Sequence, residues 1–162
     1  MSKSAQKILD TAEQLFNQHS FTGVGVDLIR DQAGCSKTTM YTYYSNKQQL
    51  VIQVLKARDL KFRQSLSTCV QGHDKLDAIH KIYDWHMDWF QTDTFKGCLF
   101  IRAVAESTAQ DQAFIEIAQQ HKSWIKNLIH QQVMSFKHAD EITELTYNFL
   151  EALISRFLVE GF

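Results

Sequence analysis

The chain contains no proline, and this absence restricts its fold more than any other feature of the sequence. Because proline interrupts helices and only six glycines occur among the 162 residues, helices can run long. Strand-like alternation of apolar and polar residues between turn signals is hard to find. Apolar residues make up 44% of the sequence, which is enough to form a core. The sequence therefore predicts an all-α fold, organised as one compact domain or two small ones.

Residues 26–47 carry the pattern of two short helices joined by a tight turn. Apolar residues recur at helical spacing between Val26 and Ala33, so the first helix can bury one side. Gly34 can take a positive φ and end this helix, and Ser36 can cap a second helix that begins directly after it. Two helices joined by three or four residues that include a glycine are typical of a helix-turn-helix motif.

The second helix of this motif separates an apolar side from a polar one. Met40 and Tyr44 lie four residues apart and are expected to face inward. The outer side then carries one cation, two hydroxyls and two phenols, but no carboxylate. These side chains are Lys37, Thr38, Thr39, Tyr41 and Tyr43. Such a face can lie against phosphates and base edges in the major groove of duplex DNA.

The stretches ILDTAEQLF at residues 8–16 and VDLIRDQAGCSKTTMYTYYSNKQQL at residues 26–50 resemble the N-terminal domain of the TetR family of transcriptional regulators. The residues that match the family pattern are Leu15, Phe16, Ile29, Ala33, Gly34, Ser36, Tyr41, Tyr44 and Lys47. The resemblance implies a helix-turn-helix DNA-binding domain at residues 1–47. It also implies a helical domain for effector binding and dimerisation at residues 48–162.

The resemblance further implies that Lys47 contacts a DNA phosphate. The charge of Lys47 in a first helical turn works against the helix dipole, and an external anion would account for it. Four positions depart from the family pattern: Ser20 replaces a glycine, Gly25 a capping serine or threonine, Arg30 a small residue, and Cys35 a valine. The candidate DNA-binding residues are Gly25, Lys37, Thr38, Thr39, Tyr41, Tyr43 and Lys47.

Charge is distributed unevenly along the chain. Residues 1–60 carry seven Lys and Arg against five Asp and Glu, whereas residues 61–162 carry ten against thirteen. No acidic residue occurs between Gln32 and Arg58. A solvated surface would explain such a run of cations, but its coincidence with the motif favours contacts with phosphate.

The rest of the chain is also expected to be helical. Helices are expected from about residue 4 to 19, 47 to 68, 74 to 91, 111 to 136 and 140 to 160, with a short one after Gly97. The last two have more apolar surface than so small a bundle can cover. They either complete the core of a monomer or pair with a second chain in a four-helix interface. The resemblance implies the homodimer, whose two recognition helices would reach major grooves about 34–36 Å apart and bind a palindromic operator.

Aromatic and soft side chains are unusually frequent in the second part of the chain. For any single one of these residues, ordinary core packing is as good an explanation as a ligand pocket. The resemblance, however, implies a cavity for a small apolar or aromatic effector. The candidate pocket residues are Tyr83, His86, Met87, Trp89, Phe90, Phe100, His121 and Trp124. His80, Asp84 and Asp88 share a helical spacing that a metal could use, but such faces are more often solvated, so no metal or cofactor is expected.

These observations favour a homodimeric repressor that leaves its operator when the effector binds. The alternative is a helical protein-interaction or sensor module without sequence-specific DNA binding, and Gly25 and Arg30 are the residues that support it. An enzyme is not expected, because the H-E-x-x-H, phosphate-loop and G-x-S-x-G motifs do not occur. The chain shows no signal peptide and no apolar run of about 20 residues, so a cytoplasmic protein without membrane contact is expected.

Overall fold

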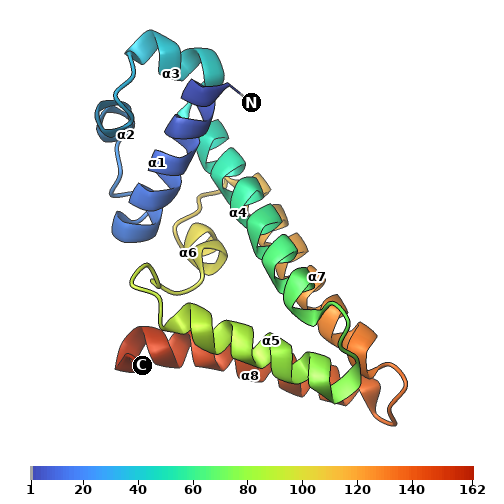
Figure 1. The fold of residues 1–162 in the computed structure, drawn as a ribbon. Helices are drawn as coiled ribbons and strands as arrows, with labels where there is room; N and C mark the ends of the chain where they lie inside the picture. Colours follow the sequence, from blue (N-terminus) through green and yellow to red (C-terminus); the bar gives the residue numbers. More distant parts are fainter. Residues whose placement is uncertain (1) are drawn as a thin grey trace. The chain divides into compact units, whose positions relative to one another are not determined.

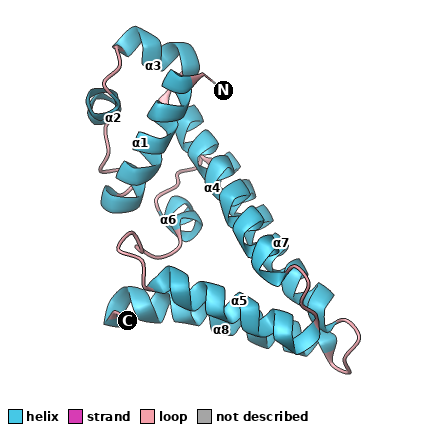
Figure 2. Cartoon of the chain, in the orientation of Figure 1, coloured by secondary structure: helices cyan, strands magenta, loops and turns pink. Residues whose placement is uncertain are grey.

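The computed structural model describes residues 2–162, which form eight α-helices and no strand (Figure 1). Figure 2 shows the same helices joined by short connections. The helices are α1 (Lys3–His19), α2 (Val26–Ala33), α3 (Lys37–Tyr43), α4 (Lys47–Val70), α5 (Lys75–Phe90), α6 (Leu99–Ala105), α7 (Gln112–Val133) and α8 (Ala139–Glu160). The predicted all-α fold is confirmed. Within residues 2–162, no helix is long and apolar enough to cross a membrane.

The chain packs as two compact units that do not follow each other in sequence. Unit 1 comprises the described residues up to Leu60 together with Leu99–Ala118. Unit 2 comprises Lys61–Cys98 and Gln119–Phe162. Helices α4 and α7 therefore contribute residues to both units, whereas α6 belongs entirely to unit 1. The assignment of DNA binding to residues 1–47, and of effector binding and dimerisation to residues 48–162, remains a prediction.

Helix α1 forms the core of unit 1. Ser2 caps its start by accepting a hydrogen bond from the Ala5 amide at 3.1 Å. Further along, Leu15 and Phe16 are fully buried, and the Phe16 ring packs on Phe21 with ring centroids 5.0 Å apart. This apolar stripe gives the short helices α2 and α3 a surface to pack against (Figure 1).

The connection from α1 to α2 is tightly constrained. Ser20 ends α1 with φ 82° and ψ 162°, a conformation that is almost restricted to glycine and costs roughly 1–3 kcal/mol. The Ser20 hydroxyl accepts a hydrogen bond from the Gly23 amide at 3.0 Å. A Cβ at Gly23 would lie 2.7 Å from the His19 carbonyl oxygen, so only glycine fits there. The helix thus ends at a strained serine where the family pattern has glycine.

Unit 2 is held by apolar side chains from four helices. Leu66, Ile82, Ile129 and Leu150 come from α4, α5, α7 and α8 respectively, and all four are buried in one cluster. A second cluster contains Phe90, Leu153 and Ile154, with partly buried aromatic side chains around it. Helices α7 and α8 therefore both contribute to the core of a single chain.

Candidate nucleic-acid interface

The turn between α2 and α3 is built by Gly34. This residue has φ 62° and ψ 41°, the left-handed conformation in which glycine carries no steric penalty. Its amide donates to the Asp31 carbonyl at 3.1 Å, and the next amide, of Cys35, donates to the Arg30 carbonyl at 3.2 Å. These two bonds form a Schellman motif, which ends α2 and turns the chain into α3. The helix-turn-helix predicted from the sequence is present.

Helix α3 is fixed at both ends. Ser36 caps its start by accepting a hydrogen bond from the Thr39 amide at 3.0 Å. Met40 and Tyr44 are 2% and 6% exposed, as their spacing predicted. The Tyr44 hydroxyl donates to the Ala5 carbonyl of α1 at 2.9 Å, which ties the end of α3 to the core helix. The opposite face of α3 is thereby directed to solvent.

The outer face of α3 carries the side chains expected there. Lys37, Thr38, Tyr41 and Tyr43 are exposed, and Thr39 is half-exposed. The Thr39 hydroxyl lies 2.8 Å from the Ser36 hydroxyl, so it partly serves the helix cap. The exposure of this face is confirmed, and its contact with DNA remains a prediction.

Thr42 is a further exposed hydroxyl on α3 that the sequence analysis did not single out. It donates to the Thr38 carbonyl at 2.8 Å and keeps acceptor capacity towards solvent. Beside it lies a groove of about 440 Å³ between α1, α3 and α4. The groove is lined by Ala5, Leu9, Tyr41, Thr42, Tyr43, Tyr44, Ser45, Gln49 and Gln53. No charged side chain is among these lining residues.

Lys47 is the first residue of α4 and is half-buried. Asn46 caps this helix, since its side-chain oxygen accepts a hydrogen bond from the Gln49 amide at 2.8 Å. Burial lowers the pKa of the Lys47 ammonium, while the carboxylate of Glu106 acts in the opposite direction. A partly desolvated cation at a helix N-terminus gains more from a bound phosphate than an exposed lysine does.

Two of the four departures from the family pattern lie at the N-cap of α2 and within this helix. Gly25 occupies the N-cap position and forms no side-chain capping bond, and a Cβ there would meet nothing within 4 Å. The Arg30 guanidinium contacts Asp27 at 2.6 Å and Asp31 at 2.7 Å. These carboxylates raise the pKa of Arg30, and they hold its side chain along α2.

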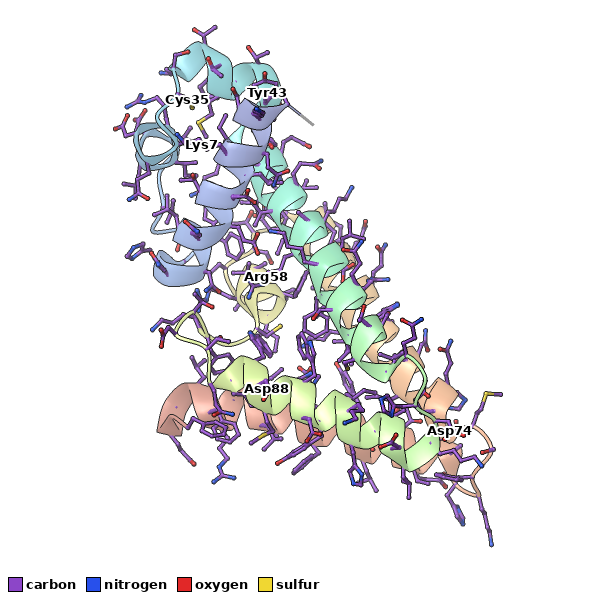
Figure 3. The ribbon with its side chains drawn as sticks, viewed as in Figure 1. Lys7, Cys35, Tyr43, Arg58, Asp74 and Asp88 are labelled. Atoms are coloured by element: carbon purple, nitrogen blue, oxygen red, sulfur yellow. The ribbon has the colours of Figure 1, made fainter. Side chains whose placement is uncertain are left out.

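A cation from α1 lies next to the turn of the motif. The Lys7 Nζ is 3.5 Å from the position that a Cβ on Gly34 would take. Figure 3 shows Lys7 close to Cys35 and on the same part of unit 1 as Tyr43. The helix-turn-helix and the helices next to it therefore contribute three lysines: Lys7 from α1, Lys37 from α3 and Lys47 from α4.

The candidate effector residues occupy several environments. His86 and Phe90 are buried in unit 2, where the Trp89 ring packs between the Phe90 and Phe95 rings at 5.5 and 5.1 Å. Buried His121 packs on Phe62 at 4.8 Å. These aromatic side chains form an interlocked cluster. The remaining candidates there are Met87, which is half-buried against Phe90, and Trp124, which is partly buried with the Arg63 guanidinium over its ring.

Two of the candidate effector residues lie apart from this cluster. Phe100 is buried in unit 1 as part of α6. Tyr83 is 36% exposed and stacks on Phe149 with ring centroids 6.3 Å apart. That pair belongs to a groove of about 380 Å³ between α5 and α8, which Leu145 and Ile79 also line. The assignment of all eight residues to an effector pocket remains a prediction.

The pKa of the buried His86 imidazole is strongly lowered. Its Nδ1 donates to the Ile82 carbonyl at 2.7 Å, which fixes the tautomer. Burial lowers its pKa to about 4, and the nearby Lys122 and His121 add to the effect. The imidazole is therefore neutral at pH 7. In residues 2–162, no group of three or more His, Cys, Asp and Glu side chains is placed to hold a metal ion, so His80, Asp84 and Asp88 do not form one.

Residues 8–54 match the family described as bacterial regulatory proteins, tetR family. The chain is 29% identical over 104 residues to the HTH-type transcriptional repressor NemR of Escherichia coli, covering 62% of this chain and 52% of that protein. It is 25% identical over 117 residues to an uncharacterised HTH-type transcriptional regulator of Lactococcus lactis, covering 70% and 60%. The chain thus spans between half and three-fifths of the length of these curated relatives.

Solved structures show the same fold. A tetR transcriptional regulator from Streptomyces avermitilis superimposes with a TM-score of 0.85 at 18% identity, covering 99% of this chain and 89% of the other. The reduced form of E. coli NemR superimposes with a TM-score of 0.84 at 19% identity, covering 96% and 88%. At these identities the likeness establishes the arrangement of helices.

Proposed function

Because the chain belongs to the TetR family of bacterial regulatory proteins, we propose that it binds duplex DNA through α2 and α3 and regulates transcription. The observation that carries this proposal is the outer face of α3, where exposed Lys37, Tyr41 and Tyr43 stand on a helix fixed from behind by buried Met40. In this arrangement Lys37 and the tyrosine hydroxyls meet phosphates and base edges, and Lys47 holds a phosphate at the start of α4. The proposal includes a cytoplasmic location, where the duplex lies, and no catalytic activity.

The proposal includes a homodimer that places two such faces on a palindromic operator. Exposed apolar side chains on α8 support it, with Leu145 71% and Phe149 53% exposed. The exposed positions of α7 are instead polar, for example Gln120 and Asn127. We therefore assign the apolar centre of the interface to α8 and its polar rim to α7.

The proposal also includes release from DNA by a small apolar or aromatic molecule that binds in unit 2. The aromatic side chains around Trp89 and Phe90 supply the matching chemistry, and the buried imidazoles of His86 and His121 supply polar groups among them. Such a molecule weakens DNA binding only if it binds the DNA-free form more tightly than the DNA-bound form.

A selection of bound fragments from random duplex DNA, followed by affinity measurements at several salt concentrations, tests the proposal. We expect a palindromic site and a steep loss of affinity with salt. The double variant Tyr41→Ala/Lys47→Ala should abolish binding to that site and leave the dimer intact. Lys137→Ala, which removes an exposed cation after α7 and outside the run of cations between Gln32 and Arg58, is the control and should retain binding.

Two outcomes would contradict the proposed function. Weak binding without a preferred sequence would favour a protein-interaction module. Full affinity in the Tyr41→Ala/Lys47→Ala variant would show that the outer face of α3 is not the reading surface.

A further inference from the structure

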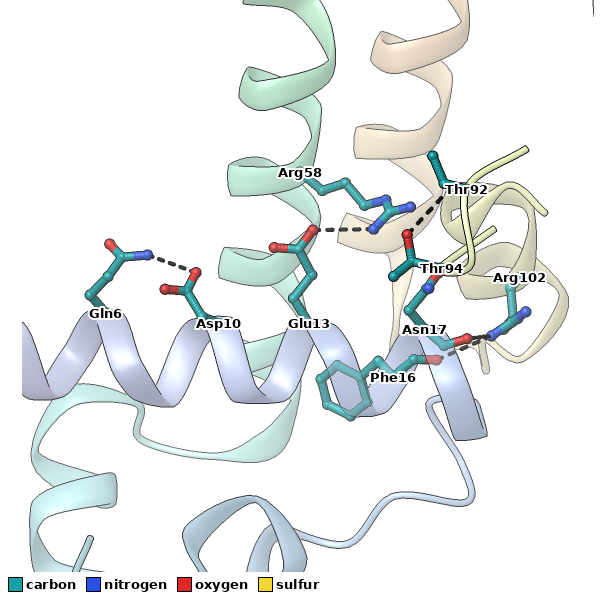
Figure 4. Close-up of polar contacts among 9 residues, drawn as sticks. All are labelled: Gln6, Asp10, Glu13, Phe16, Asn17, Arg58, Thr92, Thr94 and Arg102. Carbon is teal, nitrogen blue, oxygen red and sulfur yellow. Dashed lines mark hydrogen bonds and ion pairs between the residues drawn. The ribbon is translucent and has the colours of Figure 1, made fainter. Parts of the chain in front are cut away.

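Helix α6 belongs to unit 1 although it follows 38 residues of unit 2 in the chain, Lys61–Cys98. Two hydrogen bonds from Arg102 connect it to α1. The Arg102 Nη1 donates to the Asn17 carbonyl at 2.8 Å and to the Phe16 carbonyl at 3.1 Å (Figure 4). Both carbonyls lie in the last turn of α1, where partners within the helix run out and the helix dipole is negative. A cation from α6 therefore caps the C-terminus of α1.

Glu106 makes a second contact one helical turn further along. Glu106 directly follows α6, and its amide donates to the Arg102 carbonyl at 3.0 Å, which continues the helical turn and places the two side chains on the same side. The Glu106 Oε2 accepts hydrogen bonds from the Thr22 amide at 2.7 Å and the Thr22 hydroxyl at 2.9 Å. Hydrogen bonds to a carboxylate are stronger than those between neutral groups.

The two contacts flank the strained connection between α1 and α2. Arg102 holds the chain just before Ser20, and Glu106 holds it just after. A non-glycine residue persists in the Ser20 conformation only when its surroundings impose it. Within the connection, the Ser20 hydroxyl bonds only to near neighbours. Arg102 of α6 and Glu106, directly after α6, add support from outside the connection.

We propose that Arg102 and Glu106 form a two-point latch that holds the α1–α2 connection in the form that binds DNA. Both are positioning residues, since they act on the reader through the chain and not through DNA. Opening the latch relaxes Ser20 and frees the start of α2, so DNA affinity falls while the face of α3 stays chemically intact. This inference rests on the proposed function and names how that function is regulated.

The polypeptide chain connects unit 2 directly to the helix that carries Arg102. Leu99, where α6 begins, directly follows Cys98 and is two residues from Gly97. Gly97 has φ 76°, and a Cβ there would lie 2.9 Å from the Leu158 side chain of α8. Glycine at position 97 lets the backbone pass close to α8 directly before α6, so we infer that a rearrangement of α8 reaches the start of α6 through the chain.

Hydrogen exchange and DNA binding of Glu106→Ala, Glu106→Gln and the control Glu116→Ala test the latch in the full chain. Glu116 is an exposed carboxylate on α7 within unit 1. In Glu106→Ala we expect amide exchange at residues 20–24 to rise about tenfold and operator affinity to fall several-fold. The salt dependence should not change, because no phosphate contact is lost. Glu106→Gln removes the same negative charge near Lys47 but keeps an acceptor oxygen for Thr22, so its exchange and affinity should fall between those of wild type and Glu106→Ala, and the difference between the two variants reports the hydrogen bonds.

Unchanged exchange at residues 20–24 would overturn the latch. Faster exchange with operator affinity equal to that of Glu116→Ala would overturn its positioning role. If the wild-type protein binds no duplex, the proposed function fails and the positioning role fails with it. The exchange measurement then still decides whether Glu106 holds the connection.

Discussion

His86 shows how burial changes the chemistry of a single residue in unit 2. Its imidazole is 2% exposed and surrounded by aromatic rings, including Trp85 at 5.1 Å and Phe90 at 6.2 Å. The neutral form is favoured because burial penalises a charge, and the nearby Lys122 and His121 add to this effect, although the hydrogen bond from Nδ1 to the Ile82 carbonyl acts in the opposite direction. The helical spacing predicted that His86 faces inward, but the pKa depends on neighbours from other helices.

We expect stability to fall as the pH drops below the unfolded pKa of His86. The folded pKa is lowered to about 4 from an unfolded value of 6.5, so between these values the unfolded chain binds more protons. The contribution is fully present above pH 6.5 and lost as the pH falls towards 4, amounting to about 3 kcal/mol. Urea unfolding of wild type and His86→Asn between pH 4.5 and 7.5 measures it.

The asparagine amide can still donate to the Ile82 carbonyl but does not titrate in this range. The pH dependence of stability should therefore be shallower in His86→Asn than in wild type. His80→Asn, which changes an exposed imidazole on the same helix, is the control. Equal slopes for wild type and His86→Asn would contradict the assignment.

Helix α2 is bounded by two glycines with different roles. Gly34 needs its left-handed conformation to form the turn into α3, whereas Gly25 has φ −81° and open space around a Cβ. Glycine is thus required at the C-terminal end of α2, at Gly34, and replaceable at its N-terminal end, at Gly25. The geometry of the helix-turn-helix depends on Gly34 alone of the two.

We expect Gly34→Ala to destabilise the protein by about 1–2 kcal/mol, because an alanine is strained at this φ. Gly25→Ser should instead stabilise by a few tenths of a kcal/mol, because its hydroxyl can cap α2. Thermal unfolding of the two variants measures both changes in stability, which should have opposite signs. Equal stability in the two variants would show that the turn does not depend on Gly34.

Local signals in the sequence predicted the helix boundaries well, because caps act within a few residues. Ser36 caps α3 as its position indicated, and Asn46 caps α4 through an equally local bond. The Gln48 side chain, in the first turn of α4, donates to the Asp111 side chain at 2.9 Å. That partner lies 63 residues away, beyond the reach of a local pattern.

In the candidate site, too, local features could be predicted from the sequence and long-range contacts could not. The outer face of α3 could be predicted because helical periodicity determines which side chains are exposed. The contacts of Arg102 with α1 could not, because they join residues 85 and 86 positions apart and neither partner is a side chain with a recognisable pattern. Backbone carbonyls accept hydrogen bonds whatever residue carries them, so the sequence holds no signal for such a pair.

At the scale of the whole molecule, the proposed dimer depends on the exposed apolar side chains of α8. Leu145 and Phe149 line one groove with Tyr83 of α5. Exposed apolar groups that lie together on one surface are characteristic of interfaces. Aromatic anchors in such a patch supply much of the binding energy of a dimer.

We expect Leu145→Ser/Phe149→Ser to weaken the homodimer about a hundredfold, because each truncated anchor costs at least about 1.4 kcal/mol. Met134→Ser, which alters an exposed methionine after α7, is the control and should leave the dimer unchanged. Sedimentation equilibrium over a range of protein concentrations measures the association. A wild-type protein that remains monomeric would contradict the proposed dimer, and an unaffected double variant would contradict this interface.

The discontinuity of unit 1 has a consequence for protein synthesis. The ribosome completes α1, α2 and α3 well before it adds Leu99–Ala118, the segment that carries Arg102 and Glu106. At roughly 5–20 residues per second, the interval from Leu60 to Ala118 lasts about 3–12 s. A nascent chain therefore exposes the helix-turn-helix before the residues that complete its support exist. Under the proposed function, the DNA-binding form is therefore completed late in translation.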